Sequence, residues 1–347
     1  MRNIWRNIIM VAQLVLGCMG MLCSCTPDNV PSEEEYTIRV GTYNLWCAHS
    51  RTKKLTADPG IDTQRYWKQS SVAMNAIVDE MDCDIYAFQE IGDSIYGKKG
   101  PQTALKTHMA GAGYEWKIWS NVDGTPVTDQ AGSLSYSPGI CYKKSVFTLL
   151  SGGVFWLGGN PAKPEFVRTE DFDPVYGDDN RACVWARVRH KASGKVFYFM
   201  SAHLDTRSFG GVSYKMVNDR NCMNLMSHAD GFIVPQGVPS IIAGDMNVTP
   251  EGSGYAHLMN HKGRRHVWKD AYYVAQEACL LGTAAATSPF TNNSAKGEIG
   301  NSRIDHVFVD GFDVLGYDIN QNKYKTENGS EHYPSDHFPV IVTLKFS

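Results

Sequence analysis

This sequence of 347 residues lacks several features that mark special classes of protein. Its formal net charge is only −3 and no basic stripe runs along it, so composition does not support a nucleic-acid partner. It has no internal repeat, no low-complexity tract and no linker-like break after residue 36. Its 43% of hydrophobic residues suffice for a large core, so the length fits one large domain as well as two small ones.

The cysteines lack the spacing of a zinc site. No CxxC pair occurs among the cysteines that follow residue 25, which are Cys47, Cys83, Cys141, Cys183, Cys222 and Cys279. Most of them lie inside apolar runs, where cysteine acts as a small hydrophobic residue. We therefore expect core positions for most of them, and the sequence leaves disulfide pairing open.

The first residues contain no apolar run of comfortable membrane-spanning length. Arg2 and Arg6 precede an apolar stretch from about Ile8 to Leu22, and polar and acidic residues follow at 26–35. A membrane span needs about 20 apolar residues, whereas a basic start with a shorter apolar region is typical of an export signal. Loss of that segment would change the net charge to −5.

Leu22-Cys23-Ser24-Cys25 resembles the lipobox of bacterial lipoproteins. The resemblance implies cleavage before Cys25, acylation of its sulfur and attachment to the cell envelope, on the periplasmic side or the cell surface. Cys18 is a second candidate that would leave more apolar residues in the mature tail, and a soluble signal peptide cut elsewhere is a third interpretation. We expect a signal peptide over 1–25, an acidic tether over 26–36 and one folded domain over 37–347.

Strand-like and helix-like segments alternate after residue 36. Apolar, β-branched and aromatic runs predict strands at 37–46, 84–88, 139–142, 146–150, 182–188, 196–200, 240–243, 304–309 and 340–344. Helical spacing predicts helices at 62–82, 101–111, 213–231 and 253–261. In the third helix, Met216, Val217, Met223 and Met226 are expected on one side. The periodicity indicates an α/β protein and no more.

Polar side chains occur where several of these apolar runs begin or end. They are Asn44, Gln89-Glu90, His203 and Asp205, Asp245 and Asn247, Asp305-His306 and Asp336-His337. Each has an ordinary structural explanation when taken singly, because Asp and Asn favour turns. Strands of a packed sheet bring their ends to one rim, however, so such residues can converge there.

In order and spacing, these residues resemble the endonuclease/exonuclease/phosphatase superfamily. The likeness extends from about residue 38 to 346 and rests on Asn44 in GTYNLW, Glu90 in FQEI, His203 in SAHLD, Asp245 and Asn247 in IAGDMN, Asp305 in SRIDHVFV, and Asp336 and His337 in PSDHFPV. It implies a DNase I-like four-layer α/β/β/α sandwich, with two mixed β-sheets packed face to face and helices outside. It also implies that 37–347 is a catalytic domain for phosphoric esters.

The resemblance implies a divalent metal held by Asn44, Glu90 and Asp336. A hard cation prefers oxygen ligands and stabilises charge on a phosphate and its leaving oxygen. Glu90 would be the principal ligand, Asn44 would supply an amide oxygen beside it, and Asp336 would join from the opposite side. Magnesium is the first expectation and manganese the alternative.

The resemblance also assigns the proton transfer. His337 would be the general base toward the attacking water, with Asp305 fixing its tautomer. Some accounts of the family make Asp245 the base instead, and the sequence leaves this open. Asp245 and Asn247 would position the water and a phosphoryl oxygen.

Two further positions concern the substrate. His203 would bond a non-bridging phosphoryl oxygen, and protonation of the leaving group is a further role that the resemblance allows. Arg181 matches a basic position that contacts substrate phosphate in some relatives, and a salt bridge with Asp178 or Asp179 explains it equally well.

We therefore expect a metal-dependent phosphoesterase that acts on a phosphodiester or phosphomonoester outside the cytoplasm. A DNase-type nuclease is the alternative, and nucleic acid is not the favoured substrate because the mature chain is acidic. A catalytically silent binding lipoprotein is a second alternative, which the complete set of polar residues disfavours. The sequence implies no protein partner.

Overall fold

The computed structural model describes part of the chain, and the described residues are 36–46, 63–92, 101–120, 123–126, 138–163, 181–206, 213–260, 265–276, 303–325 and 331–347. The chain divides into two units, Met1–Glu35 and Tyr36–Ser347, and all described residues belong to the second. The expected signal peptide and Cys25 thus lie outside the described residues. No helix in the described ranges is long and apolar enough to cross a membrane.

The first sheet has six strands in the order β11-β14-β1-β2-β4-β3. These strands are β1 (Thr37–Asn44), β2 (Ile85–Gln89), β3 (Tyr114–Ile118), β4 (Gly139–Lys143), β11 (Phe312–Ile319) and β14 (Val340–Phe346). The sheet is mixed, because β1 and β2 are parallel while the other neighbours are antiparallel.

The second sheet also has six strands, in the order β5-β6-β7-β8-β10-β9. They are β5 (Phe147–Trp156), β6 (Ala182–His190), β7 (Val196–His203), β8 (Ser240–Asp245), β9 (Lys269–Asp270) and β10 (Asp305–Asp310). Only β7 and β8 run parallel. The short strands β12 (Tyr324–Lys325) and β13 (Glu331–His332) form a separate pair.

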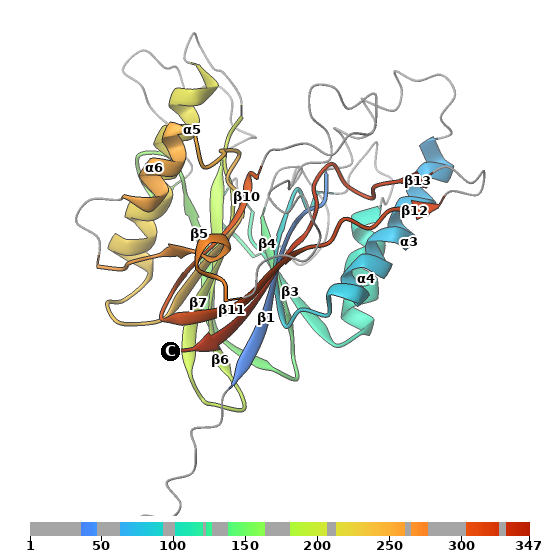
Figure 1. Ribbon diagram of the computed structural model, residues 1–347, viewed down its shortest axis with the longest axis horizontal. Helices are drawn as coiled ribbons and strands as arrows, with labels where there is room; N and C mark the ends of the chain where they lie inside the picture. The colour runs from blue at the N-terminus through green and yellow to red at the C-terminus, as the bar shows by residue number, and fades with distance from the viewer. Residues whose placement is uncertain are drawn as a thin grey trace, which may run out of the picture. The chain divides into compact units, whose positions relative to one another are not determined.

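The two sheets lie face to face at the centre, with helices on both outer sides (Figure 1). The helices are α3 (Thr63–Met81), α4 (Pro101–Gly111), α5 (Tyr214–His228), the π-helical turn η1 (Ala229–Ile233), α6 (Ser253–Met259) and α7 (Ala271–Val274). Helices α3 and α4 cover the first sheet, and α5 and α6 cover the second. One apolar core lies between the sheets and two more lie beneath the helices. The four-layer α/β/β/α sandwich is therefore confirmed.

Every strand and helix predicted from periodicity occurs, but the short elements β9, β12, β13 and α7 were missed, as were the longer strands β3 and β11. Their sequences, YEWKI and FDVLGYDI, interrupt the apolar positions with charged residues and, in β11, with a glycine. The expectation for the third helix was wrong in part, since Met216 and Met223 are 57% and 38% exposed while Val217 and Met226 are buried. Successive helical residues point about 100° apart, so Met216 and Val217 face different directions.

The buried cysteines act as core residues. Cys83, Cys141, Cys183 and Cys222 are free thiols without solvent exposure. Burial raises the pKa of each thiol, to about 12 for Cys83, so they stay protonated and unreactive. Cys47 and Cys279 lie outside the described residues.

Gly244 allows the centre of the second sheet to form next to the polar rim. It pairs with Ala202 of β7 on one side and His306 of β10 on the other, and its φ is 152°. A Cβ atom here would lie 2.0 Å from the carbonyl oxygen of Ala202. Only glycine fits this approach, and the following residue is Asp245.

A buried polar bridge joins the two sheets just below the rim. The side-chain amide nitrogen of Gln89 lies 3.3 Å from both Thr42 Oγ1 in β1 and Ser201 Oγ in β7. Ser201 Oγ in turn donates to the carbonyl oxygen of Phe88 at 3.1 Å. These bonds satisfy polar groups that would otherwise be costly to bury, and they fix the offset between the sheets.

Candidate active site

The strand order brings the predicted polar residues to one rim. Asn44 pairs with Gln89 at the ends of parallel β1 and β2, and His203 pairs with Asp245 at the ends of parallel β7 and β8. Asp305 opens antiparallel β10 opposite Asp245. The carboxyl ends of β1, β2, β7 and β8 therefore meet the start of β10 at the same edge.

Asn44 links the two halves of this rim. Its Nδ2 lies 2.9 Å from Asp245 Oδ2 and 3.2 Å from Glu90 Oε1, so one amide donates toward carboxylates from both sheets. Its Oδ1 accepts from the backbone nitrogen of Trp46 at 2.9 Å. Glu90 itself has a left-handed backbone with φ of 54°, which is uncommon for a residue with a side chain and often marks a functional position.

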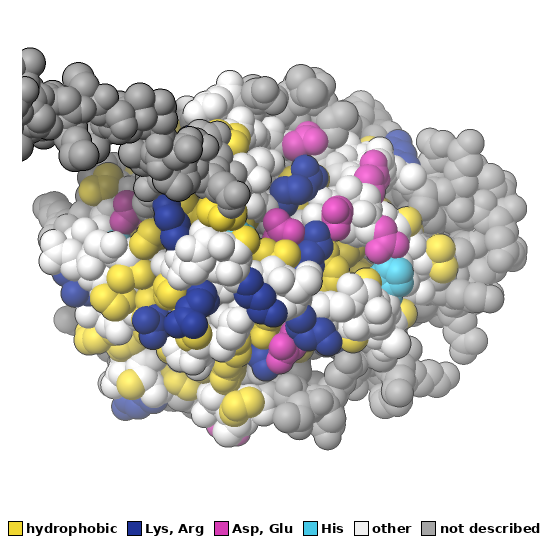
Figure 2. Space-filling view, turned by 90° about the horizontal axis from the view of Figure 1, so that it is seen from below, with side chains coloured by type: hydrophobic (Ala, Val, Ile, Leu, Met, Phe, Trp, Pro, Cys, Tyr) yellow, Lys and Arg dark blue, Asp and Glu magenta, His cyan; other side chains and the backbone are white. Residues whose placement is uncertain are grey.

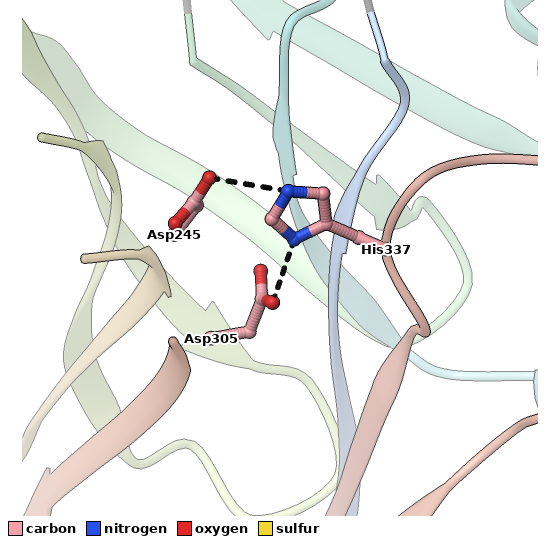
Figure 3. Close-up of side chains that lie close together, drawn as sticks. All are labelled: Asp245, Asp305 and His337. Carbon is pink, nitrogen blue, oxygen red and sulfur yellow. Dashed lines mark hydrogen bonds and ion pairs between the residues drawn. The ribbon is translucent and has the colours of Figure 1, made fainter. Parts of the chain in front are cut away.

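His337 lies between two carboxylates (Figure 3). Its Nδ1 is 2.8 Å from Asp305 Oδ2, and its Nε2 is 3.5 Å from Asp245 Oδ2. An ionised carboxylate only accepts hydrogen bonds, so His337 donates from Nδ1 to Asp305 and directs Nε2 toward Asp245. This is the tautomer that a histidine base needs.

The pKa values of Asp245 and His337 depend on burial and on their mutual charges. Burial raises the pKa of the Asp245 carboxyl from 3.8 to about 7, with His337 opposing this shift and Asp305 adding to it. Burial lowers the pKa of the His337 imidazole, but the charges of Asp305 and Asp245 outweigh it and hold that pKa well above its usual value. At neutral pH the pair retains a proton at the Asp245–His337 contact.

Asn247 fixes the orientation of Asp245. The backbone nitrogen of Asn247 donates to Asp245 Oδ1 at 2.9 Å, and its side-chain amide donates to the carbonyl oxygen of Leu204 at 2.9 Å. A φ of 50° at Asn247 makes this tight turn, and asparagine tolerates that conformation better than most residues. The structure therefore places Asn247 beside the end of β7 and behind the carboxylate.

His203 approaches the same carboxylates from β7. Its Nε2 is 3.4 Å from Asp245 Oδ2 and 3.9 Å from Glu90 Oε1. On its other side, Nδ1 is 2.9 Å from Nη1 of Arg181, whose Nη2 is 3.8 Å from Asp205 Oδ1. Arg181 is thus buried behind His203, while Asp178 and Asp179, the partners weighed from sequence, lie outside the described residues.

Ser335 also belongs to the site, although the sequence did not predict a role for it. Its Oγ donates to the carbonyl oxygen of Asn44 at 2.6 Å and accepts from the backbone nitrogen of His337 at 3.2 Å. The loop that carries Asp336 and His337 is therefore attached directly to the end of β1. The signal was present, since Ser335 precedes the Asp-His pair in the sequence.

A second buried network, also missed, supports the start of β10. Arg303 Nη1 lies 2.9 Å from Asp270 Oδ2 and 2.9 Å from His306 Nδ1, and the guanidinium stacks 4.5 Å from the ring centre of Tyr272. Burial raises the pKa of Asp270, but hydrogen bonding with His306 and the charge of Arg303 outweigh this effect and lower that pKa to about 2. Asp305 lies two residues after Arg303, so the network anchors the strand that presents it.

The donor set at the rim suits a hard divalent cation. Glu90 and Asp245 both accept hydrogen bonds from the side-chain amide of Asn44. The negative charge of Asp336 contributes to the raised pKa of His337. One ligand atom each from Asp245, Asp305 and His337 also lie within 4.8 Å of one another. Carboxylate oxygens dominate, as Mg²⁺ and Mn²⁺ prefer. Binding through Asn44 Oδ1 would require its amide to turn away from Trp46.

Comparison with known proteins gives a family and a fold. A model described as the Endonuclease/Exonuclease/phosphatase family matches residues 41–337. No curated protein matches the chain. A solved protein of that description from Bacteroides thetaiotaomicron is similar, with a TM-score of 0.66 and 23% identity over 90% of this chain and 99% of that chain.

Two further solved structures share this architecture. A mannosyl-6-phosphatase of the same bacterium has a TM-score of 0.66 and 23% identity, over 89% of this chain and 100% of its own. The human nocturnin catalytic domain with bound sulfate has a TM-score of 0.58 and 15% identity, over 90% and 98%. At such identities the likeness establishes the fold.

Proposed function

The chain belongs to the Endonuclease/Exonuclease/phosphatase family, and on that premise we propose that it is a metal-dependent phosphoesterase in which water attacks phosphorus. The observation that carries this proposal is the line Asp305–His337–Asp245, with contacts of 2.8 and 3.5 Å, at a rim that also holds Glu90. Hydrolysis of a phosphate ester needs a base that accepts a proton from water and a cation that stabilises the negative charge. A histidine oriented by a buried carboxylate, beside a cation site rich in oxygen atoms, can provide both.

His337 and Asp245 act as one proton-accepting unit. Asp305 holds the Nδ1 proton of His337, so Nε2 is the atom that takes the proton from water. The oxygen of that water bonds to phosphorus, and the bond from phosphorus to the ester oxygen breaks. Asp245 is near enough to Nε2 to share the accepted proton, so its raised pKa of about 7 makes it part of the base.

Glu90, Asp336 and Asn44 are the residues that would hold the cation. When bound, a divalent cation supplies charge that neutralises the phosphate, stabilises the departing oxygen and favours loss of the proton from the Asp245–His337 pair. Asn247 keeps Asp245 in place through its backbone nitrogen. Ser335 keeps His337 on the same rim.

For the substrate, we propose a phosphate monoester or diester of a small molecule. The exposed lysines Lys144, Lys191 and Lys195 lie in the turns after β4 and β6, at the end of the strands away from the rim. Figure 2, seen from below, shows Lys and Arg side chains spread over that end of the molecule. These basic residues lie away from the candidate active site, whereas a protein that binds duplex DNA there would place basic residues around it to contact the phosphates. The similar mannosyl-6-phosphatase supports hexose 6-phosphates as test substrates.

The location also remains a proposal, which rests on the lipobox-like Leu22–Cys25 segment. We propose that the protein is exported, cut before Cys25 and held at the cell envelope by acyl chains. The substrate would then be met outside the cytoplasm.

The experiment is an assay of metal-stripped protein with Mg²⁺ or Mn²⁺ added back. Substrates would be p-nitrophenyl phosphate, bis-p-nitrophenyl phosphate, a hexose 6-phosphate, inositol phosphates, sphingomyelin and plasmid DNA. Turnover that requires the cation and disappears in His337→Ala, but not in the control His257→Ala on α6, supports the proposal. Hydrolysis of DNA alone would identify a nuclease, and no hydrolysis with either ion would favour a binding lipoprotein.

A further inference from the structure

Arg181 and His203 are brought together by neighbouring strands. Strand β6 begins at Ala182 and β7 ends at His203, and the two are antiparallel with Cys183 opposite Ala202. Arg181, directly before β6, therefore lies beside the end of β7. Both residues are buried, with 8% and 3% exposure, and Arg181 Nη1 is 2.9 Å from His203 Nδ1.

The chemistry of arginine decides which ring nitrogen of His203 carries a proton. A guanidinium group has five N–H donors and no acceptor, and it does not lose a proton in proteins. At 2.9 Å, His203 Nδ1 must therefore be the acceptor. A proton on Nδ1 would place two N–H groups against each other, so the ring proton is on Nε2.

Arg181 is itself held in place from behind. Its Nη2 is 3.8 Å from the buried carboxylate of Asp205. The backbone nitrogen of Asp205 donates to Asn221 Oδ1 at 3.1 Å, and Asn218 Nδ2 donates to the carbonyl oxygen of Asp205 at 3.1 Å. Two amides of α5 thus fix Asp205. The guanidinium is kept behind His203 and away from the rim.

The protonated nitrogen of His203 points into the site. Nε2 lies 3.4 Å from Asp245 Oδ2 and 3.9 Å from Glu90 Oε1, the carboxylates that the proposed reaction uses. An N–H in this position can donate a hydrogen bond to a phosphoryl oxygen. It is poorly suited to transfer that proton, because loss of it would leave a ring without any proton.

We propose that Arg181 is a positioning residue that holds His203 in the Nε2–H form, so that His203 donates a hydrogen bond to a non-bridging phosphoryl oxygen and does not protonate the leaving group. The inference rests on the proposed phosphoesterase function. When the bond from phosphorus to the ester oxygen breaks, its electron pair stays on the leaving oxygen, which then takes a proton from a water molecule. Of the two roles that the sequence left to His203, this geometry selects the first.

The first test reads the tautomer directly, without metal or substrate. Nitrogen-15 NMR of the histidine rings in the metal-free full chain distinguishes protonated from unprotonated ring nitrogens, and His203→Gln assigns the signals. We expect His203 to have a proton on Nε2 and none on Nδ1. A proton on Nδ1 would overturn the inference.

Variants then test the role of Arg181. In Arg181→Met, we expect a population of His203 with a proton on Nδ1, whereas Arg187→Met, at an exposed position on β6, should leave the spectrum unchanged. An unchanged spectrum in Arg181→Met would remove Arg181 as the positioning residue. Because this variant removes the positive charge beside the buried carboxylate of Asp205, Arg181→Met combined with Asp205→Asn provides the same test in a chain that lacks both charges.

The second test compares leaving groups. His203→Gln should lower kcat/KM for p-nitrophenyl phosphate and for a hexose 6-phosphate by the same factor, because a lost bond to a non-bridging oxygen affects both alike. General acid catalysis is worth about 10²- to 10⁴-fold, so a loss larger by that factor for the alkyl ester would overturn the inference. If the wild-type protein hydrolyses no phosphate ester of the panel above, the proposed function fails, while the NMR result still decides the tautomer.

Discussion

Asn44 Nδ2 lies 2.9 Å from Asp245 Oδ2, which joins the last residue of β1 in one sheet to the last residue of β8 in the other. The same nitrogen lies 3.2 Å from Glu90 Oε1. One amide thus separates two carboxylates that would otherwise repel each other across the rim. This amide therefore helps to hold the carboxylates of the two sheets at the rim.

Substitution of Asn44 should therefore damage catalysis and cation binding together. We expect Asn44→Ala to lower kcat/KM by about 10²-fold, the usual loss when one positioned donor is removed from a site. Calorimetric titration of Mg²⁺ should show weaker binding. Asn322→Ala, which removes an exposed asparagine bonded to Glu80, is the matched control and should retain wild-type values. Equal activity in both variants would contradict the proposed role.

The raised pKa values predict that the metal-free protein loses stability as pH rises. Asp245 binds its proton more tightly in the folded state, with a pKa raised from 3.8 to about 7, and the pKa of His337 is also raised. Their contributions are complete below the unfolded pKa values and are lost as pH rises through the folded ones. Thermal unfolding in EDTA should therefore show a Tm that falls between pH 5 and 8.

Asp245→Asn provides the control for this pH dependence, because asparagine cannot ionise. We expect a shallower decline of Tm in that variant, and the decline should remain unchanged in Asp313→Asn, an exposed position on β11. The Tm gained on addition of Mg²⁺ should grow with pH in the wild-type protein, because the cation competes with the retained proton. A Tm that rises with pH in EDTA would contradict the assignment.

The pair of Asp270 and Arg303 should be important for stability. Both residues are 2% exposed, so Asp270→Asn leaves a buried guanidinium without its counter-charge. Removal of one partner of a buried pair costs about 3–5 kcal/mol, which urea denaturation would measure as a fall in the free energy of unfolding. An exposed change such as Asp313→Asn should stay within about 0.5 kcal/mol. A similar small loss in Asp270→Asn would show that the network contributes little.

Alanine substitutions at two glycines with positive φ distinguish the cost of backbone strain from the cost of steric crowding. Gly244 and Gly194 have φ of 152° and 72°, but an added Cβ meets Ala202 O at 2.0 Å in the first and nothing within 4 Å in the second. We expect Gly194→Ala to cost about 1–2 kcal/mol, from the left-handed backbone alone. Gly244→Ala should cost more than about 4 kcal/mol or prevent folding, as severe core clashes do. Comparable losses in the two variants would refute the crowding argument.

The proposed anchor gives a prediction about location. Cys25→Ser should move the protein from the membrane fraction to the soluble fraction, because acyl chains supply the attachment. Cys18→Ser should leave it in the membrane fraction. Release in Cys18→Ser instead would make Cys18 the modified residue, and release in neither variant would contradict an anchor at Cys25.

Much of the fold and the rim could be predicted because most strands of the core have their own apolar run. Asn44, Asp245 and His337 stand at the ends of such runs, so their convergence follows from sheet packing. The strands β3 and β11 were missed because they contain no continuous apolar run, although the alternation of apolar and charged residues in YEWKI is typical of a half-buried strand. The sequence of a single strand does not show which strands pair with it in the folded sheet.

The partners of single side chains were the least predictable part. From sequence, Arg181 had two readings, substrate phosphate or a nearby acid, and the structure places it against His203 across a strand pair. Asp270 and Arg303 are 33 residues apart and meet only because β9 and β10 are adjacent. Ser335 was visible in its motif, but its acceptor, the carbonyl of Asn44, is 291 residues away.

The pairing of β14 with β1 has a consequence for the order of events during synthesis. The first and last strands of the domain are neighbours, so the sheet is completed only by residues made some 300 positions after it begins. Contacts this distant along the chain form slowly, and Ser335 and His337 reach the rim only when they do. A nascent or truncated chain therefore lacks His337 at the rim, and the proposed hydrolysis requires that the whole domain has folded.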